Sequence, residues 1–350
     1  MKETKTLTLS QCNVIKVSMM LMVIFYHSIC LWGEETWFIP AAESSKILAF
    51  FCKFLNSIHI YVFTFVSGFL FYFLKYEKKR YHSLLKDVGD RAKRLLFPYI
   101  VVAVLWVVPF SIYYFHTEPL IILRNYFFGE SPSQLWFLLM LFVVFCLFYL
   151  LADFFYKHNF FVGGIFCAFF YIIGFIGERF IPNVFQIWTA LKYIFYYWLG
   201  FYFCKEKTNF FYKIPFFVYL IVFFFLFCCN YFFIKKQEGI FFSCLSIILS
   251  PVINTFGVLT VVVGVSKINT KDLENTKFLK FLEKYNFTMY LFHQQLIYMM
   301  ISLLNGKAPI WIMVIVNLIV ALVGSMVISI IISKIPKIRC IFGYKEKDKK

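Results

Sequence analysis

The sequence predicts an all-α protein: a polytopic bundle of about ten membrane-spanning helices with both termini in the cytoplasm. Of the 350 residues, 61% are hydrophobic and 15% are charged, which leaves too little polar surface for a water-soluble fold of this size. The apolar residues also form long uncharged runs, such as 135–152, 240–265 and 310–333. Each run is long enough to cross a bilayer as a helix.

The distribution of lysine and arginine supports the same topology. With the N-terminus placed in the cytoplasm, 26 of the 35 Lys and Arg residues fall in inner segments and 6 in outer loops. This is the asymmetry of the positive-inside rule. The net charge of +17 is therefore mainly a topology signal. It does not predict a nucleic-acid partner, which would require basic residues on one solvated face.

We expect a multi-pass protein of the cell membrane (inner or plasma membrane), in contact with membrane lipid. The chain 1–350 is interpreted as one transmembrane domain with a basic cytoplasmic tail at 334–350. Pro98 is expected in the first turn of the third helix, where its missing N–H costs little. The predicted helices span 13–32, 47–74, 95–115, 135–156, 160–177, 186–204, 214–234, 240–265, 285–304 and 310–333.

Several ionisable side chains lie inside these predicted spans. A lysine at mid-span costs about 2.5–3.5 kcal/mol on insertion scales, so its presence needs a reason. Snorkelling to the interface is one reason for a lysine, and a hydrogen bond between helices is one for a histidine. The residues concerned are Lys16, His27, Lys53, His59, Lys192 and His293.

Lys16 and His27 belong to one face of the first helix. They are 11 residues apart, which at 100° per residue is about 20° beyond three turns and about 16 Å along the axis. This face is expected to point into the bundle, with Lys16 near the cytoplasmic surface and His27 in the outer half. The pair predicts a polar line through the membrane.

Arg91 and Arg94 precede the third helix at a spacing that makes them neighbours on a helix surface. Two guanidinium groups at this spacing can hold a phosphate. The alternative is that they only flank an inner helix end, as basic residues do in most membrane proteins.

Four further residues are weaker candidates for lining a tunnel or an acceptor site. Ser67 precedes Gly68 in the second helix, and this small pair favours close helix packing or the approach of a ligand. Trp136 begins the fourth helix, where it also suits an interfacial anchor. Tyr290 and His293 share a face of the ninth helix with Asn286.

In their order along the chain, these segments resemble the acyltransferase family 3 of integral membrane proteins. The resemblance rests on KVSMMLMVIFYH from Lys16 to His27, VFTFVSGFLF from Val62, RAKRLLFPY from Arg91, QLWFLLML from Gln134 and NFTMYLFHQ from Asn286. Members of the family usually have Arg where this chain has Lys16. Lysine keeps the charge but loses the planar fork of two donors.

The resemblance implies transfer of an acyl group, commonly acetyl, from cytoplasmic acyl-CoA to a hydroxyl of a cell-surface glycan or its lipid-linked precursor. It implies that His27 is catalytic, that Arg91 and Arg94 bind the acyl donor with Lys16, and that acyl-CoA is a co-substrate without a permanently bound cofactor. His27 could act as a general base or form an acyl-histidine intermediate. No metal site is expected. A multi-pass transporter or flippase of the same glycan remains the alternative function.

Overall fold

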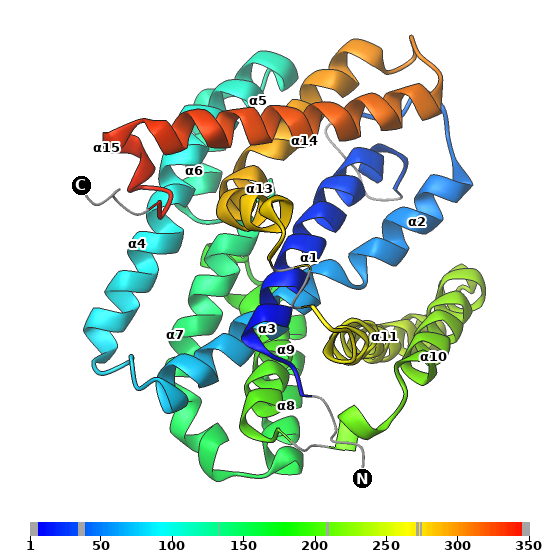
Figure 1. Ribbon diagram of the computed structural model, residues 1–350. Coiled ribbons are helices and arrows are strands. Elements are labelled where there is room, and N and C mark those ends of the chain that lie inside the picture. Colours follow the sequence, from blue (N-terminus) through cyan, green and yellow to red (C-terminus); the bar gives the residue numbers. More distant parts are fainter. Residues whose placement is uncertain are drawn as a thin grey trace.

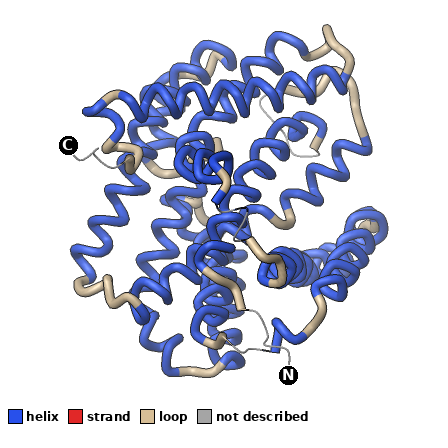
Figure 2. Tube along the Cα trace, viewed as in Figure 1, coloured by secondary structure: helices blue, strands red, loops and turns tan. Residues whose placement is uncertain are grey.

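The protein is built from helices that pack side by side. The computed structural model describes residues 6–33, 39–131, 133–207, 210–270, 273 and 275–344. Within these ranges there are helices and loops but no strand (Figure 2). The prediction of a polytopic helical bundle is confirmed. Of the predicted basic tail, residues 345–350 lie outside the described residues.

Helical structure occurs at all ten predicted positions, with short additional helices between them (Figure 1). The α-helices are α1 Leu9–Ile29, α2 Lys46–Asn56, α3 His59–Tyr72, α4 Leu84–Val102, α5 Val108–Phe115, α6 Pro119–Phe127, α7 Trp136–Lys157, α8 Phe160–Phe180, α9 Ile187–Lys205, α10 Phe216–Cys228, α11 Ile240–Ser266, α13 Lys277–Leu304, α14 Ile310–Lys334 and α15 Pro336–Arg339.

In the described part of the chain, eight helical segments are long and apolar enough to cross a membrane. The two predicted spans outside this set are α9 and α13, which have 19 and 28 residues. Both are long enough to span, but they carry more polar and aromatic side chains. Their packing explains this composition, because α9 lies against α3 and α8 while α13 lies against α14 and α1. Helices surrounded by protein do not need a lipid-facing apolar surface.

Three helix predictions are wrong in detail. The predicted helix 285–304 begins earlier, at Lys277. The predicted helix 47–74 is divided into α2 and α3 by a turn at Ser57 and Ile58. The predicted helix 95–115 begins earlier, at Leu84, because the charged residues before position 95 form an amphipathic first half that an apolar search does not detect. Pro98 therefore lies inside α4, not in its first turn, and removes one interior hydrogen bond from that helix.

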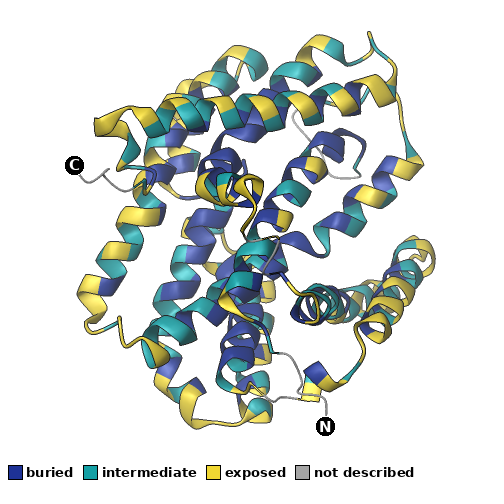
Figure 3. Ribbon diagram, in the orientation of Figure 1, coloured by how far each residue is buried: buried dark blue, intermediate teal, exposed yellow. Residues whose placement is uncertain are grey.

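The centre of the bundle is α1, which packs against α2, α3, α11, α13 and α14. Its buried residues include Cys12, Met20, Val23 and Ile24, all fully enclosed. Figure 3 shows buried residues concentrated on α1 and on the helices around it, whereas exposed residues are frequent along outer helices such as α4, α10 and α14. Large apolar residues are frequent among these exposed positions, as expected of a surface that faces lipid.

Glycine residues allow α3 and α9 to cross with their backbones in contact. A Cβ atom added at Gly68 would lie 1.8 Å from the Tyr197 carbonyl oxygen, and one added at Gly200 would lie 1.9 Å from the Phe65 carbonyl oxygen. The two backbones thus touch reciprocally, as small residues permit in membrane bundles. The packing interpretation of the Ser67–Gly68 pair is correct for Gly68. On the same helix α9, Lys192 forms an ion pair with Glu178 of α8.

Candidate active site

Two histidines from distant parts of the sequence meet inside the bundle. The Nδ1 atom of His27 on α1 lies 2.7 Å from the Nε2 atom of His293 on α13, and the ring centroids are 4.9 Å apart. His293 is fully buried, and His27 is half-buried. The His27 side chain therefore points into the bundle, as its helix face predicted.

The hydrogen bonds determine which nitrogen carries each proton. The Nδ1 atom of His293 lies 2.7 Å from the Tyr290 carbonyl oxygen, and a carbonyl can only accept. Nδ1 of His293 therefore donates, and Nε2 of the neutral ring accepts. It follows that His27 donates from Nδ1 to His293, so that the lone pair of neutral His27 lies on Nε2. The histidine pair, His27 with His293, thus places a basic nitrogen at a fixed position.

A third histidine adjoins this pair. His59, the first residue of α3, is buried, and its Nδ1 atom lies 2.7 Å from the Leu55 carbonyl oxygen. Its ring centroid is 4.7 Å from that of Tyr26, the residue next to His27. His59 thus directly follows the turn that divides the second span.

A glutamine holds α13 in place beside α7. The side-chain amide of Gln134 donates to the Leu291 carbonyl at 2.8 Å and to the Gln295 side chain at 2.9 Å. Its main-chain N–H donates to the Gln294 side chain at 2.7 Å, and the Tyr290 hydroxyl donates to its carbonyl. Tyr290 therefore braces the helix that carries His293, both through this bond and through its own carbonyl.

Charged side chains of α1, α13 and α4 lie within electrostatic range of one another toward the other end of the bundle. The charges of Glu283 on α13 and Arg94 on α4 both act on the Lys16 ammonium. Glu283 precedes His293 by ten residues, and Lys16 precedes His27 by eleven, so the two helices run parallel with matched polar positions. Between these positions lies Asn286, whose Oδ1 atom is buried without a hydrogen-bond partner among the described residues.

Arg91 and Arg94 lie within α4 and not in a loop. The Arg91 guanidinium carbon is 5.1 Å from the centre of the Phe145 ring. Its Nε atom is buried with no hydrogen-bond partner in the described part of the chain. Burial raises the pKa of Tyr81, while the charges of Arg91 and Arg94 oppose this effect, so both guanidinium groups lie near its hydroxyl. A buried donor without an acceptor is costly, and an incoming phosphate would satisfy it.

The remaining candidates are not part of the histidine pair. The Ser67 hydroxyl donates to the Phe63 carbonyl at 3.0 Å within its own helix. Trp136 begins α7, with its ring 6.0 Å from that of Tyr193. In the described residues no group of three His, Cys, Asp or Glu side chains could hold a metal ion.

Sequence analysis named Asn286 as a polar residue of the His293 face and Gln134 as the start of a motif, but made neither a candidate site residue. A signal for Asn286 was present, because it shares a helix face with His293 at a spacing of seven residues. Gln134 offered no signal of this kind, since its role depends on contacts with a helix about 160 residues away.

The comparison with protein families agrees with this geometry. The model described as an acyltransferase domain matches residues 10–334, nearly the whole chain. The chain belongs to acyltransferase family 3. No curated protein and no solved structure matches it significantly. The protein is thus a multi-pass membrane acyltransferase, and the family assignment separates it from the transporter that the sequence left open.

Proposed function

We propose that this acyltransferase moves an acyl group, acetyl being the expected one, from cytoplasmic acyl-CoA to a hydroxyl of a cell-surface glycan or its lipid-linked precursor. The observation that carries the proposal is the hydrogen bond between His27 and His293. It fixes a neutral imidazole with its lone pair on Nε2, which is what a base for a hydroxyl requires.

The donor would bind at the Lys16 end of α1. Lys16, Arg91 and Arg94 supply three positive charges from two helices, and the buried Nε of Arg91 lacks an acceptor among the described residues. The phosphates of CoA are too polar to enter hydrocarbon, so they would stay with these residues. The extended arm of CoA would then follow α1 for the roughly 16 Å that separate Lys16 from His27.

The transfer can be written with one base. The acceptor oxygen attacks the thioester carbonyl carbon while its proton passes to Nε2 of His27. The positive charge on His27 is stabilised by the hydrogen bond from Nδ1 to His293, in the manner of a base oriented by a second residue. The carbon–sulfur bond then breaks, and the CoA sulfur leaves with the proton from His27. An acyl-histidine route would use the same nitrogen as the nucleophile.

The experiment measures CoA release and acyl transfer together. Purified protein in nanodiscs receives acetyl-CoA labelled in the acetyl group and an extract of cell envelope from a strain that lacks the protein. We expect free CoA thiol and labelled envelope material to appear in equal amounts. His27→Ala should lower both by about 10²- to 10⁴-fold with the variant still folded in the nanodisc. Intact acetyl-CoA with the wild-type protein would contradict the proposal.

A further inference from the structure

An unused hydrogen-bond acceptor lies on α13 between the cations and the histidine pair. The Oδ1 atom of Asn286 is buried and has no hydrogen-bond partner in the described part of the chain. An amide oxygen can only accept a hydrogen bond, and leaving it buried without a donor is costly. The position therefore favours a ligand that brings an N–H or O–H group to this oxygen.

Helix geometry places Asn286 on the path between the two ends of the site. It follows Glu283, whose charge acts on Lys16, by three residues, and it precedes His293 by seven. Seven residues correspond to about 10.5 Å along the axis and to a rotation within about 20° of two full turns. His293 faces α1, because it contacts His27. Asn286 therefore lies on the face of α13 that is turned toward α1.

The facing part of α1 offers no polar side chain at these positions. Met20 and Val23 lie on the same face as Lys16, four and seven residues after it, and before His27. A polar arm that follows α1 between the lysine and the histidine obtains no hydrogen bond from these apolar side chains. Asn286 supplies an acceptor from the opposite helix.

A second unused group at the same end has the opposite hydrogen-bonding sense. The Nε atom of Arg91 is a donor that is also buried without a partner among the described residues. Arg94 lies one turn after Arg91, and Glu283 lies one turn before Asn286. The charges of Arg94 and Glu283 both act on Lys16. A ligand at this lysine that satisfies both unused groups carries an anionic acceptor for Arg91 and an N–H or O–H donor for Asn286.

The arm of CoA has this pattern. Its phosphates are anionic acceptors, and its pantetheine arm contains one amide N–H on the cysteamine side and another on the pantoate side. In an extended arm the cysteamine-side nitrogen lies about 4 Å from the sulfur, and the pantoate-side nitrogen about 8 Å from it, by analogy with an extended peptide chain. Only the longer reach, with a hydrogen bond of about 3 Å added, matches the axial distance of about 10.5 Å from His293 to Asn286.

We propose that Asn286 is a donor-binding residue, whose Oδ1 atom accepts a hydrogen bond from the pantoate-side amide N–H of the CoA arm. The inference rests on the proposed function, because it requires CoA to follow α1 from the cations toward His27. The contact sets how far the arm enters the bundle, and it thereby places the thioester at the histidine pair.

Direct binding of CoA tests this contact without requiring acyl transfer. The wild-type protein in nanodiscs is titrated with CoA, with an analogue in which an ester oxygen replaces the pantoate-side N–H, and with an analogue that has the same replacement on the cysteamine side. We expect the pantoate-side ester to bind about tenfold more weakly than CoA, as for the loss of one hydrogen bond. The cysteamine-side ester should bind like CoA.

Substitutions assign the preference to Asn286. Asn286→Leu removes the acceptor with little change in volume, so this variant should bind CoA and the pantoate-side ester equally. Asn286→Asp should keep the preference for CoA, because a carboxyl oxygen still accepts the hydrogen bond.

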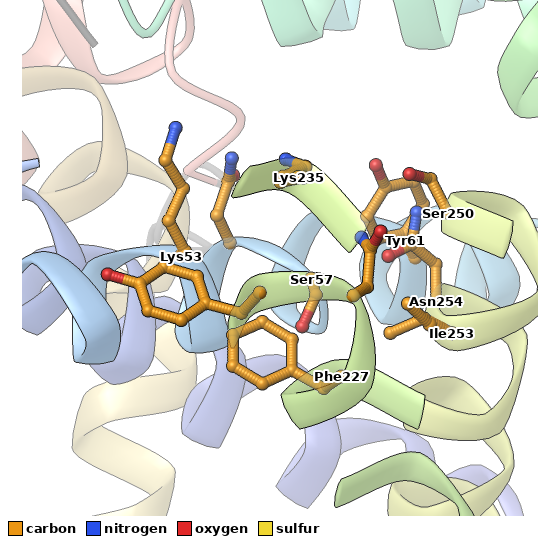
Figure 4. A pocket seen from close by; sticks show the side chains of 11 residues that line it. Lys53, Ser57, Tyr61, Phe227, Lys235, Ser250, Ile253 and Asn254 are labelled. Carbon is orange, nitrogen blue, oxygen red and sulfur yellow. The ribbon is translucent and has the colours of Figure 1, made fainter. Parts of the chain in front are cut away.

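Asn230→Leu is the matched control. The Oδ1 atom of Asn230 is likewise buried without a hydrogen-bond partner within the described ranges, but it lies elsewhere in the fold. Asn230 lines a cavity of about 140 Å³ between α2, α3, the end of α10 and α11 (Figure 4). None of the described residues that line this cavity belongs to α1, α4 or α13. Asn230→Leu should therefore keep the wild-type preference between CoA and the pantoate-side ester.

Equal binding of CoA and the pantoate-side ester by the wild-type protein would overturn the proposal, and this comparison needs no variant to fold. A preference that Asn286→Leu retains, or that Asn230→Leu removes, would also overturn it. The same holds for a loss of affinity confined to the cysteamine-side ester. If the wild-type protein binds no CoA at all, the proposed function fails together with this inference, whereas CoA binding without the amide preference overturns the inference alone.

Discussion

The Nδ1 atom of His27 lies 2.7 Å from Nε2 of His293, across the contact between two parallel helices. Because His293 also donates to the Tyr290 carbonyl, the donor in each of these two hydrogen bonds is fixed: Nδ1 of His293 in one and Nδ1 of His27 in the other. The basic nitrogen of His27 is thereby held in one tautomer before any substrate arrives. An orienting group of this kind is worth a large factor in rate, as the effect of the wrong tautomer in serine proteases shows.

Removing the orienting histidine should slow the chemical step. We expect His293→Ala to lower kcat by about 10²-fold, because His27 would no longer be restricted to the tautomer with its lone pair on Nε2. The KM for acyl-CoA should change little, since His293 is distant from the three cations. His158→Ala is the control, because His158 makes a similar ring-to-carbonyl contact at an exposed position. A wild-type kcat in His293→Ala would refute this role.

Arg91 should contribute to donor binding through the phosphates. We expect Arg91→Met to raise the KM for acetyl-CoA by about tenfold or more, since the CoA phosphates lose a cationic partner. Kinetics with a short acetyl thioester that lacks the nucleotide should be the same in wild type and variant. Lys93→Met on the exposed side of α4 should leave both substrates unaffected. An equal loss with the short thioester would show that Arg91 serves folding or chemistry instead.

Lys16 should act as a charge and not through a planar fork. We expect Lys16→Arg to retain most of the activity, because the field of the cation beside Arg94 and Glu283 is kept. Lys16→Met should raise the KM for acetyl-CoA by about tenfold. Steady-state kinetics of the two variants in parallel provide the test, and equal loss in both would contradict a purely electrostatic role.

Gly68 should matter for stability. A Cβ at this position would lie 1.8 Å from a backbone oxygen of α9, which cannot move aside as a flexible side chain can. We expect Gly68→Ala to destabilise the protein by about 1–3 kcal/mol or more, visible as a lower Tm in detergent. Gly89→Ala, on the exposed half of α4 where a Cβ would meet nothing within 4 Å, should leave the Tm unchanged or slightly raised.

Helical periodicity was sufficient to place Lys16 and His27 on one inward face, because both residues belong to the same regular helix. The partner of His27 could not be predicted in this way, since His293 is 266 positions away and the contact depends on how α1 and α13 pack. Sequence indicated only that His293 shares a polar face with Asn286 and Tyr290.

The errors in the helix predictions have local causes. The turn at Ser57 and Ile58 contains no glycine or proline, so nothing in its composition signals a break. Lys53 was recognisable as a cation inside a span, but the cavity beside it forms only where α2 meets the irregular end of α10 and the proline-containing α11. Such arrangements depend on tertiary packing, which a single sequence does not display.

The most direct test of the account uses membrane vesicles of known orientation that contain wild-type protein or His27→Ala, with acetyl-CoA added outside. With the predicted cytoplasmic face outward, the wild-type protein should release CoA thiol and label the glycan inside the vesicle, and His27→Ala should do neither. With that face inward, acetyl-CoA should remain intact. Undiminished transfer by His27→Ala, or equal cleavage of acetyl-CoA in both orientations, would contradict a histidine base served by a donor from the cytoplasm.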